Sequence, residues 1–323
     1  MNKNLDRRSF FGKWGIGLAS LIALRMEGFA KTFKEIAEPN NHNMKEEKDI
    51  IIKVKPLGFQ WDTQDPFLFC VHHEDKFPKG NAEMGPVGSM DGRHLGDDFI
   101  IKDGYRMYHG KRVPGFPGHP HRGFETVTVV REGFVDHADS LGAAGRYGQG
   151  DVQWMTAGKG VQHSEMFPLI YEDKENPMEL FQIWLNLPKK NKMVDAHFKM
   201  LWSDAIPKYS NTDSNGKKIE VEVMAGSLEN HKAPSPPPNS WAADPNNEVA
   251  IWNIQLEAGA QWTMPKASAG INRTIYYYEG DEINLAGKKI TKYHAVEVHA
   301  EFDISLVNGN TAARILVLQG RPI

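Results

Sequence analysis

The chain has 323 residues, of which 40% are hydrophobic and 24% are charged, and its formal net charge is −3. This length is sufficient for two ordinary domains, and the near balance of charge lacks the basic excess with which nucleic-acid-binding proteins contact phosphates. The single cysteine, Cys70, excludes an intramolecular disulfide and a zinc site built on paired cysteines. We therefore expect Cys70 to be a small buried apolar residue.

The first 30 residues have a pattern typical of an export signal. The pair Arg7-Arg8 precedes two phenylalanines, and an apolar run covers residues 14–24. That run is too short to span a bilayer but has the length of a signal h-region, and the paired arginines resemble a twin-arginine signal. Cleavage after Ala30 would place the mature protein in the periplasm. The alternative is an amphipathic helix that stays on a cytoplasmic protein. Polar residues 31–48 are predicted to be a tether.

Residues 49–232 are predicted to form a first, predominantly β unit. Short runs rich in β-branched or aromatic residues alternate with Gly and Pro, which favours strands joined by turns. One short helix is predicted over residues 192–201. The predicted strands are residues 50–54, 126–130, 152–155, 180–187 and 219–224.

A second β unit is predicted over residues 233–323, beginning at a proline-rich spacer or surface loop at residues 234–238. The pair Asn308-Gly309 is typical of a hairpin turn. Two successive all-β units suggest two small barrels or jelly rolls in tandem. The predicted strands of the second unit are residues 250–256, 273–278, 282–285, 295–299 and 304–307.

Two short stretches of the first unit place metal-ligand side chains on alternate residues. One holds His119 and His121, and the other holds His163 and Glu165. Residues two apart in a strand point to the same face, so two adjacent strands would aim three imidazoles and one carboxylate at one point. This set suits a mononuclear site for a divalent transition metal, with iron favoured if coordination positions stay open.

The two ligand stretches lie within longer segments, HPHRGFETV at residues 119–127 and GDVQWMTAGKGVQHSEM at residues 150–166. Both segments are similar to the signature motifs of the pirin family of two-domain cupins. The resemblance extends, more loosely in the C-terminal half, from about residue 50 to the end of the chain. It implies an all-β bicupin fold, in which two cupin-type jelly-roll barrels stand in tandem. It also implies that the N-terminal barrel holds one iron and that the C-terminal barrel has lost its ligands.

Carried over from the family motifs, the iron ligands are His119, His121, His163 and Glu165. Glu125 is the ambiguous member, because it has the strand parity of the first two histidines and many cupins use the equivalent glutamate as a ligand. We interpret Glu125 as hydrogen-bonded to a ligand imidazole, with a structural carboxylate as the alternative. Glu165 and Glu125 are the two candidate proton acceptors in catalysis.

The other histidines are interpreted as ordinary polar residues. In the second unit, His294 and His299 are five positions apart and would lie on opposite faces of a strand, which argues against joint metal binding. A place near the pocket entrance is the alternative for five histidines of the first unit: His72, His73, His94, His109 and His137.

Pirins continue past the Gly-x-Pro-Ile segment with which this chain ends, so either the sequence is truncated at its C-terminus or this protein does without the tail.

The resemblance implies an iron(II)-dependent dioxygenase of the quercetin 2,3-dioxygenase type, acting on a flavonol-like, enolic aromatic substrate with O₂. Four protein ligands on a six-coordinate ion leave up to two positions for substrate oxygen and O₂, and metal coordination makes a substrate hydroxyl more acidic. The alternative is a metal-dependent binding or regulatory protein that modulates a protein partner without catalysis. Another cupin chemistry also fits, because fold does not fix function. We expect a monomer with no nucleic-acid partner and no membrane anchor after signal cleavage.

Overall fold

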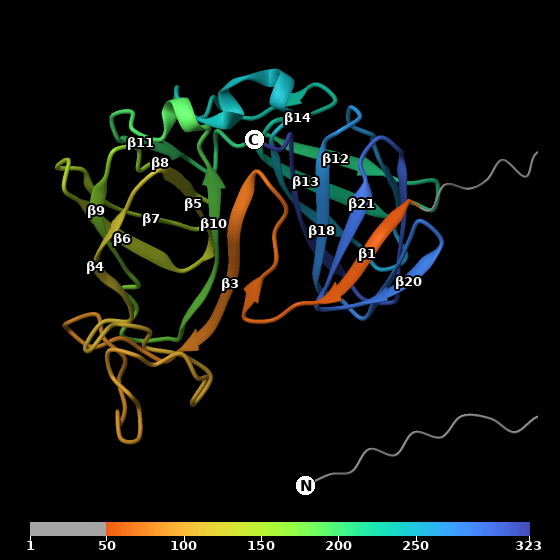
Figure 1. Cartoon of the computed structure of the whole chain (residues 1–323). Helices are drawn as coiled ribbons and strands as arrows, with labels where there is room; N and C mark the ends of the chain where they lie inside the picture. Colours follow the sequence, from red (N-terminus) through yellow and green to blue (C-terminus); the bar gives the residue numbers. More distant parts are fainter. Residues whose placement is uncertain (1–49) are drawn as a thin grey trace, which may run out of the picture. The chain divides into compact units, whose positions relative to one another are not determined.

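The computed structural model describes residues 50–323, which form a structure built almost entirely of β-strands (Figure 1). The helical elements among these residues are three single 3₁₀ turns, at Lys189–Asn191, Trp241–Ala243 and Pro245–Asn247. No helix in this part of the chain is long and apolar enough to cross a membrane. The all-β prediction is thus confirmed, while the expected export signal and tether lie outside the described residues.

The first barrel consists of two antiparallel sheets. Its six-stranded sheet has the order β11-β8-β5-β10-β3-β2, and its four-stranded sheet has the order β4-β9-β6-β7. The strands are β2 (Gln60–Trp61), β3 (Phe67–Phe77), β4 (Gly115–His121), β5 (Phe124–Glu132), β6 (Phe134–Asp139), β7 (Ala144–Gly148), β8 (Val152–Thr156), β9 (Val161–Met166), β10 (Asn176–Asn186) and β11 (His197–Leu201).

The second barrel also has two sheets. A seven-stranded sheet has the order β1-β21-β18-β23-β16-β13-β12, and a four-stranded sheet has the order β17-β22-β19-β20. The strands are β1 (Ile51–Pro56), β12 (Lys208–Thr212), β13 (Lys218–Ala225), β16 (Ala250–Leu256), β17 (Gln261–Met264), β18 (Asn272–Glu279), β19 (Glu282–Leu285), β20 (Lys288–Thr291), β21 (His294–His299), β22 (Ile304–Asn308) and β23 (Ala313–Gly320). The pair β14 (Ser227–Leu228) and β15 (His231–Lys232) forms a separate small sheet.

Strand pairing does not follow the predicted boundary between residues 232 and 233. Strand β1 pairs with β21, and strands β12 and β13 join β16, so these early strands belong to the second barrel. From residue 50 onward, the chain therefore first adds a strand to the second barrel, then forms the first barrel and then returns to the second (Figure 1). The spacing of residues along the chain predicts where strands lie but not which strands they pair with. The predicted boundary therefore assigned β1, β12 and β13 to the wrong unit.

Two local predictions were wrong because tertiary pairing decided the conformation. Within residues 192–201, the expected helix is replaced by β11, whose His197 to Leu201 pair with β8. The pair Asn308-Gly309 does not close a hairpin. Strand β22 before it pairs with β17 and β19, whereas β23 after it pairs with strands of the other sheet.

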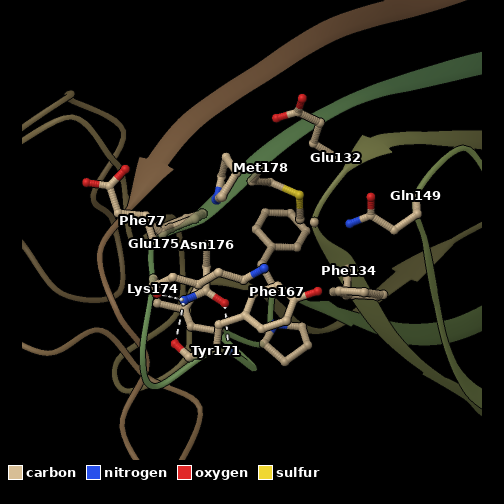
Figure 2. Close-up of a pocket in the computed structure, with 14 residues that line it drawn as sticks. Phe77, Glu132, Phe134, Gln149, Phe167, Tyr171, Lys174, Glu175, Asn176 and Met178 are labelled. Atoms are coloured by element: carbon tan, nitrogen blue, oxygen red, sulfur yellow. Dashed lines mark hydrogen bonds between the residues drawn. The ribbon is translucent and has the colours of Figure 1, made fainter.

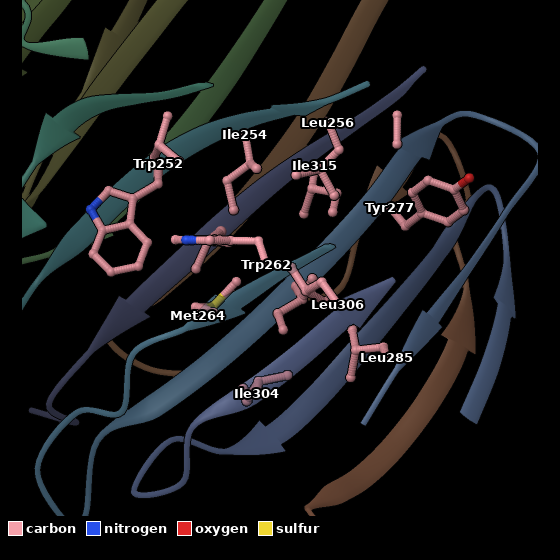
Figure 3. Close-up of a cluster of buried hydrophobic side chains, with 14 of the residues drawn as sticks. Trp252, Ile254, Leu256, Trp262, Met264, Tyr277, Leu285, Ile304, Leu306 and Ile315 are labelled. Atoms are coloured by element: carbon pink, nitrogen blue, oxygen red, sulfur yellow. The ribbon is translucent and has the colours of Figure 1, made fainter. Parts of the chain in front are cut away.

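Apolar side chains fill the interior of the second barrel (Figure 3). Within the described residues of this barrel there is no group of three or more side chains that could hold a metal ion. His294 bonds to the backbone of its own turn, and His299 lies beside Glu301. The labelled core residues are Trp252, Ile254, Leu256, Trp262, Met264, Tyr277, Leu285, Ile304, Leu306 and Ile315.

The outer face of the six-stranded sheet packs against the second barrel. Cys70, Phe181 and Ile183 are fully buried there in a cluster that includes Tyr276 of β18. Trp61 stacks on Tyr276 with 5.1 Å between ring centroids. Burial raises the pKa of the Cys70 thiol far above its usual range, so Cys70 is the inert apolar residue that the sequence predicted.

Glu125 lies on this outer face and not in the interior of the first barrel. Its carboxylate is fully buried and accepts hydrogen bonds from the Thr156 hydroxyl, at 2.5 Å, and from the Ser240 hydroxyl. Strand β4 ends before Gly123, whose φ of +78° turns the chain, so the strand parity of β4 does not continue into β5. The interpretation of Glu125 as a partner of a ligand imidazole is therefore wrong, and the structural alternative holds.

Burial raises the pKa of Glu125 from 4.5 to about 7. The folded chain then keeps this proton at pH values where the unfolded chain has released it, so stability falls as pH rises from 4.5 to about 7. Glu125→Gln cannot ionise and should gain about 1–3 kcal/mol relative to the wild type between pH 5 and pH 8. Urea unfolding at pH 5 and at pH 8 measures this difference in the free energy of unfolding.

Glu132→Gln, at an exposed position on β5, is the control, and its free energy of unfolding should differ from that of the wild type by the same amount at both pH values. If Glu125→Gln also showed no change in this difference between the two pH values, the raised pKa of a buried Glu125 carboxyl would be contradicted.

Candidate metal centre

Strands β4 and β9 are hydrogen-bonded neighbours, with His119 opposite His163. Because side chains alternate along each strand, His119 and His121 share one face and His163 joins them. The ligand nitrogens of these three histidines all lie within 4.8 Å of one another. The structure thus brings together three of the four residues that the sequence predicted as metal ligands.

A register shift in β4 shapes the wall beside this three-histidine group. The pairing with β9 slips between Phe116 and His119, where Pro117 and Gly118 add an extra residue. A β-bulge of this kind re-aims side chains and is common at active sites. It lets Phe116 point to the same interior as His119, although an odd number of positions separates them.

The state of the ring nitrogens matches a metal site. Both ring nitrogens of His163 and Nε2 of His121 are buried and have no hydrogen-bond partner among residues 50–323. His119 donates from Nδ1 to the Pro117 carbonyl oxygen at 2.9 Å, which leaves its Nε2 lone pair available. Such unpartnered buried nitrogens are costly unless they bind something. The residues present therefore fit a divalent transition metal.

Burial also keeps two of these imidazoles neutral. Desolvation, with the neighbouring histidines adding repulsion, lowers the pKa of His163 to about 3 and that of His121 to about 4. A neutral imidazole offers its lone pair to a metal without first losing a proton. Metal binding by these two residues therefore meets no competition from protons near neutral pH.

Glu165 is two residues beyond His163 on β9, and its carboxylate is buried beside the three-histidine group. Its Oε2 lies 3.9 Å from His163 Nε2. Gln182 donates to Oε2 at 2.8 Å, and the Thr128 hydroxyl lies 2.9 Å from Oε1. Ligating carboxylates are typically held by such hydrogen bonds. The role of Glu165 as a fourth ligand stays a prediction.

Thr128 and Gln182 are site residues that the sequence analysis missed. Both point into the first barrel, Thr128 from β5 and Gln182 from β10, and both contact Glu165. Alternation along each strand groups them with the other inward residues. For β5, the face that points inward depends on the turn at Gly123, which the sequence analysis did not predict.

The other histidines of the first barrel take different places. His137 is buried behind His163, with ring centroids 5.3 Å apart, and bonds to Asp139. His72 faces the second barrel, where it stacks on Phe181. His94 is exposed. Only His73 and His109 of these five border the cavity beside the three-histidine group.

A cavity of about 500 Å³ adjoins the three-histidine group. His119, His121 and Glu165 border it, so a metal held there would face the cavity. Its volume is within the range of small-molecule sites, and such sites combine apolar walls with a few polar groups. The aromatic walls are Phe59, Phe69, Phe99, Phe116, Phe167 and Trp184.

A second cavity of about 360 Å³ lies near Phe77, Phe134 and Tyr171 (Figure 2). Phe167 borders both cavities. The dashed lines in Figure 2 show that Asn176 bonds to the backbone of the adjacent turn, including Tyr171. This cavity contains none of the three histidines, so the 500 Å³ cavity is the candidate substrate site.

Comparison with known proteins identifies the family to which this chain belongs. Residues 80–185 match the family model described as Pirin. A Pseudomonas aeruginosa protein named "Putative quercetin 2,3-dioxygenase" is 36% identical over 231 residues, which cover 70% of this chain and 76% of that protein. Human pirin is 31% identical over 70% of this chain and 72% of its own length.

The fold has counterparts among solved structures. The crystal structure of quercetin 2,3-dioxygenase from Acinetobacter baumannii matches with a TM-score of 0.64 at 23% identity. The match covers 84% of this chain and 86% of that one, and at this identity it shows the shared fold alone. From its sequence relatives, its motifs and its two-barrel fold, this chain belongs to the pirin family of cupins.

Proposed function

We propose that the protein is an iron(II)-dependent dioxygenase that cleaves flavonol-like, enolic aromatic substrates. The observation that carries the proposal is the three-histidine group, of which His119 and His121 border a 500 Å³ cavity with aromatic sides. Aromatic walls favour a flat aromatic ligand, and the histidines lie where its oxygen atoms would meet a metal. The name of the Pseudomonas relative supports the same reaction class.

The chain's own residues would hold the metal at His119, His121 and His163, with Glu165 as the fourth ligand. An iron(II) ion bound there supplies the redox chemistry toward O₂ and makes a coordinated hydroxyl more acidic. Three of these four side chains, His119, His121 and Glu165, border the cavity, so a metal that they hold would be accessible from the cavity side.

Glu165 is also the nearest carboxylate to accept the substrate's hydroxyl proton. Its position is set by Gln182, which donates to Oε2, and by the Thr128 hydroxyl next to Oε1. These contacts fix the direction of the carboxylate. Glu125 has no part in this step because it lies on the outer face of the sheet.

The metal is tested first. The purified protein should contain about one transition metal per chain, and His121→Ala and His163→Ala should each weaken metal binding by roughly 10-fold or more. The apolar lining cannot replace a lost ligand. Elemental analysis measures the content, with Glu125→Gln as the matched control that should keep its metal. Unchanged metal in both histidine variants would rule out this site.

The reaction is tested with the iron-loaded protein and a panel of flavonols that includes quercetin. We expect O₂-dependent loss of the flavonol, and Glu165→Gln should lower turnover by about 100-fold or more because it removes the proton acceptor. Glu125→Gln should stay close to the wild type. Oxygen uptake above a metal-only control is the measurement. If no flavonol is consumed, the substrate assignment is wrong, and binding without O₂ uptake would favour a metal-dependent binding protein.

We also propose that the chain is exported, from the pattern of residues 1–30. Changing Arg7→Lys together with Arg8→Lys should leave the precursor in the cytoplasm, because the signal is read as paired arginines. N-terminal sequencing of the periplasmic and cytoplasmic fractions measures this, and Arg25→Lys is the control. A periplasmic product that starts at Met1 or Asn2 would contradict cleavage and favour a retained helix.

A further inference from the structure

A row of buried polar side chains leads to the cavity from the side of β3. His73 borders the cavity, and its Nδ1 lies 2.9 Å from the Tyr108 hydroxyl. That hydroxyl bonds in turn to Oδ2 of Asp75. The other oxygen of Asp75 accepts from the Arg106 backbone N–H at 2.8 Å and from the Arg106 guanidinium at 3.2 Å. All four residues are buried.

The direction of each hydrogen bond in this row follows from its fixed end. Asp75 is paired with Arg106 and accepts from it, so it is a carboxylate that can only accept. Tyr108 must therefore use its single proton toward Asp75. The Tyr108 oxygen then accepts from His73, which requires the proton of His73 to be on Nδ1. Nε2 of His73 consequently carries a lone pair and is an acceptor.

The charge states agree with this assignment. Burial, partly offset by Tyr108 and Arg106, raises the pKa of Asp75 to about 6, which leaves it ionised at neutral pH. Burial, aided by the charge of Arg106, lowers the pKa of His73 to about 3. His73 therefore has one ring proton and not two. Among residues 50–323, its Nε2 has no hydrogen-bond partner, and the ring borders the cavity.

The backbone of Tyr108 indicates that this row is held at a cost. Tyr108 is fully buried and has a φ of +55°, a left-handed conformation that residues other than glycine seldom adopt. Two backbone hydrogen bonds with Asp98, each 2.9 Å long, hold it there. Backbone strain of this kind persists where the surroundings fix it and is concentrated at functional sites.

His73 faces the metal centre across the barrel. It comes from β3 in the six-stranded sheet, whereas His119, His121 and His163 come from the four-stranded sheet. The Phe116 ring lies between the two sides, with its centroid 5.8 Å from the ring of His73 and 6.3 Å from the ring of His119. An aromatic ligand can therefore lie against Phe116 with one polar end at each side.

We propose that His73 is a specificity-determining residue, whose Nε2 accepts a hydrogen bond from a substrate hydroxyl remote from the one at the metal centre. Tyr108 and Asp75 are positioning residues that fix its tautomer. The identity of the substrate class rests on the proposed function. Because Nε2 accepts and does not donate, it selects a hydroxyl and rejects a carboxylate or a methyl ether at this place. The substrate is thus a polyhydroxylated aromatic enol.

The test compares two flavonols that share the metal-facing oxygens. Quercetin has further ring hydroxyls, and 3-hydroxyflavone has none. Dissociation constants are measured by tryptophan fluorescence quenching with the iron-loaded protein in the absence of O₂. His73→Phe keeps an aromatic ring but removes the acceptor, so the preference for quercetin should fall by about 3- to 10-fold, the value of one neutral hydrogen bond. Binding of 3-hydroxyflavone should not change.

Three further variants make the result specific. His73→Gln offers an amide oxygen near the place of Nε2 and should retain part of the preference. Tyr108→Phe leaves His73 in place but frees its tautomer, so the preference should fall. His72→Gln is the matched control, because His72 is the adjacent residue on the opposite face and bonds to Glu179. Its preference should equal that of the wild type.

The outcomes separate this inference from the proposed function. An unchanged preference in His73→Phe, or in both His73→Gln and Tyr108→Phe should His73→Phe fail to fold, overturns the role of His73 even if O₂ is consumed. A lost preference with no O₂ uptake by the wild type supports His73 and overturns the dioxygenase. Equal binding of both flavonols by the wild type also overturns the role of His73.

Discussion

The antiparallel pairing of β4 with β9 is the constraint on which the candidate site depends. With His119 opposite His163, alternation along both strands gathers three imidazoles on one face. A slip of one residue between the two strands would leave His163 on the face opposite to that of His119 and His121. The bulge at Pro117 and Gly118 then adds an aromatic wall without disturbing this register. The pairing of β4 with β9 therefore determines both the three-histidine group and part of the cavity wall.

The same alternation explains why some residues could be predicted and others could not. Within a single strand, such as the stretch from His119 to His121, spacing alone determines which side chains share a face. The predicted contact of Glu125 with a ligand imidazole was wrong because Gly123 separates two strands, and the alternation of side chains does not continue through a turn. The assignment of β1, β12 and β13 to the first barrel was wrong for a related reason. Strands that pair across a long stretch of sequence leave no local signal of their pairing.

The six-stranded sheet has two faces with different tasks. Its inner face carries Thr128, Gln182 and His73, the polar groups that border the cavity. Its outer face carries apolar side chains and the buried Glu125, which pack against the second barrel. The second barrel holds no candidate metal group in its described residues, yet it buries the back of the sheet that builds the site.

Burial gives the polar groups of the site their chemical character. Removal from water keeps His121 and His163 neutral, so they present lone pairs to a metal. The same effect leaves His73 with one proton, and the ionised Asp75 then determines through Tyr108 which nitrogen carries it. One side of the aromatic cavity thus carries imidazoles that can bind a metal, and the other side carries a hydrogen-bond acceptor, Nε2 of His73. A ligand that satisfies both must bring a metal-binding oxygen at one end and a proton donor at the other.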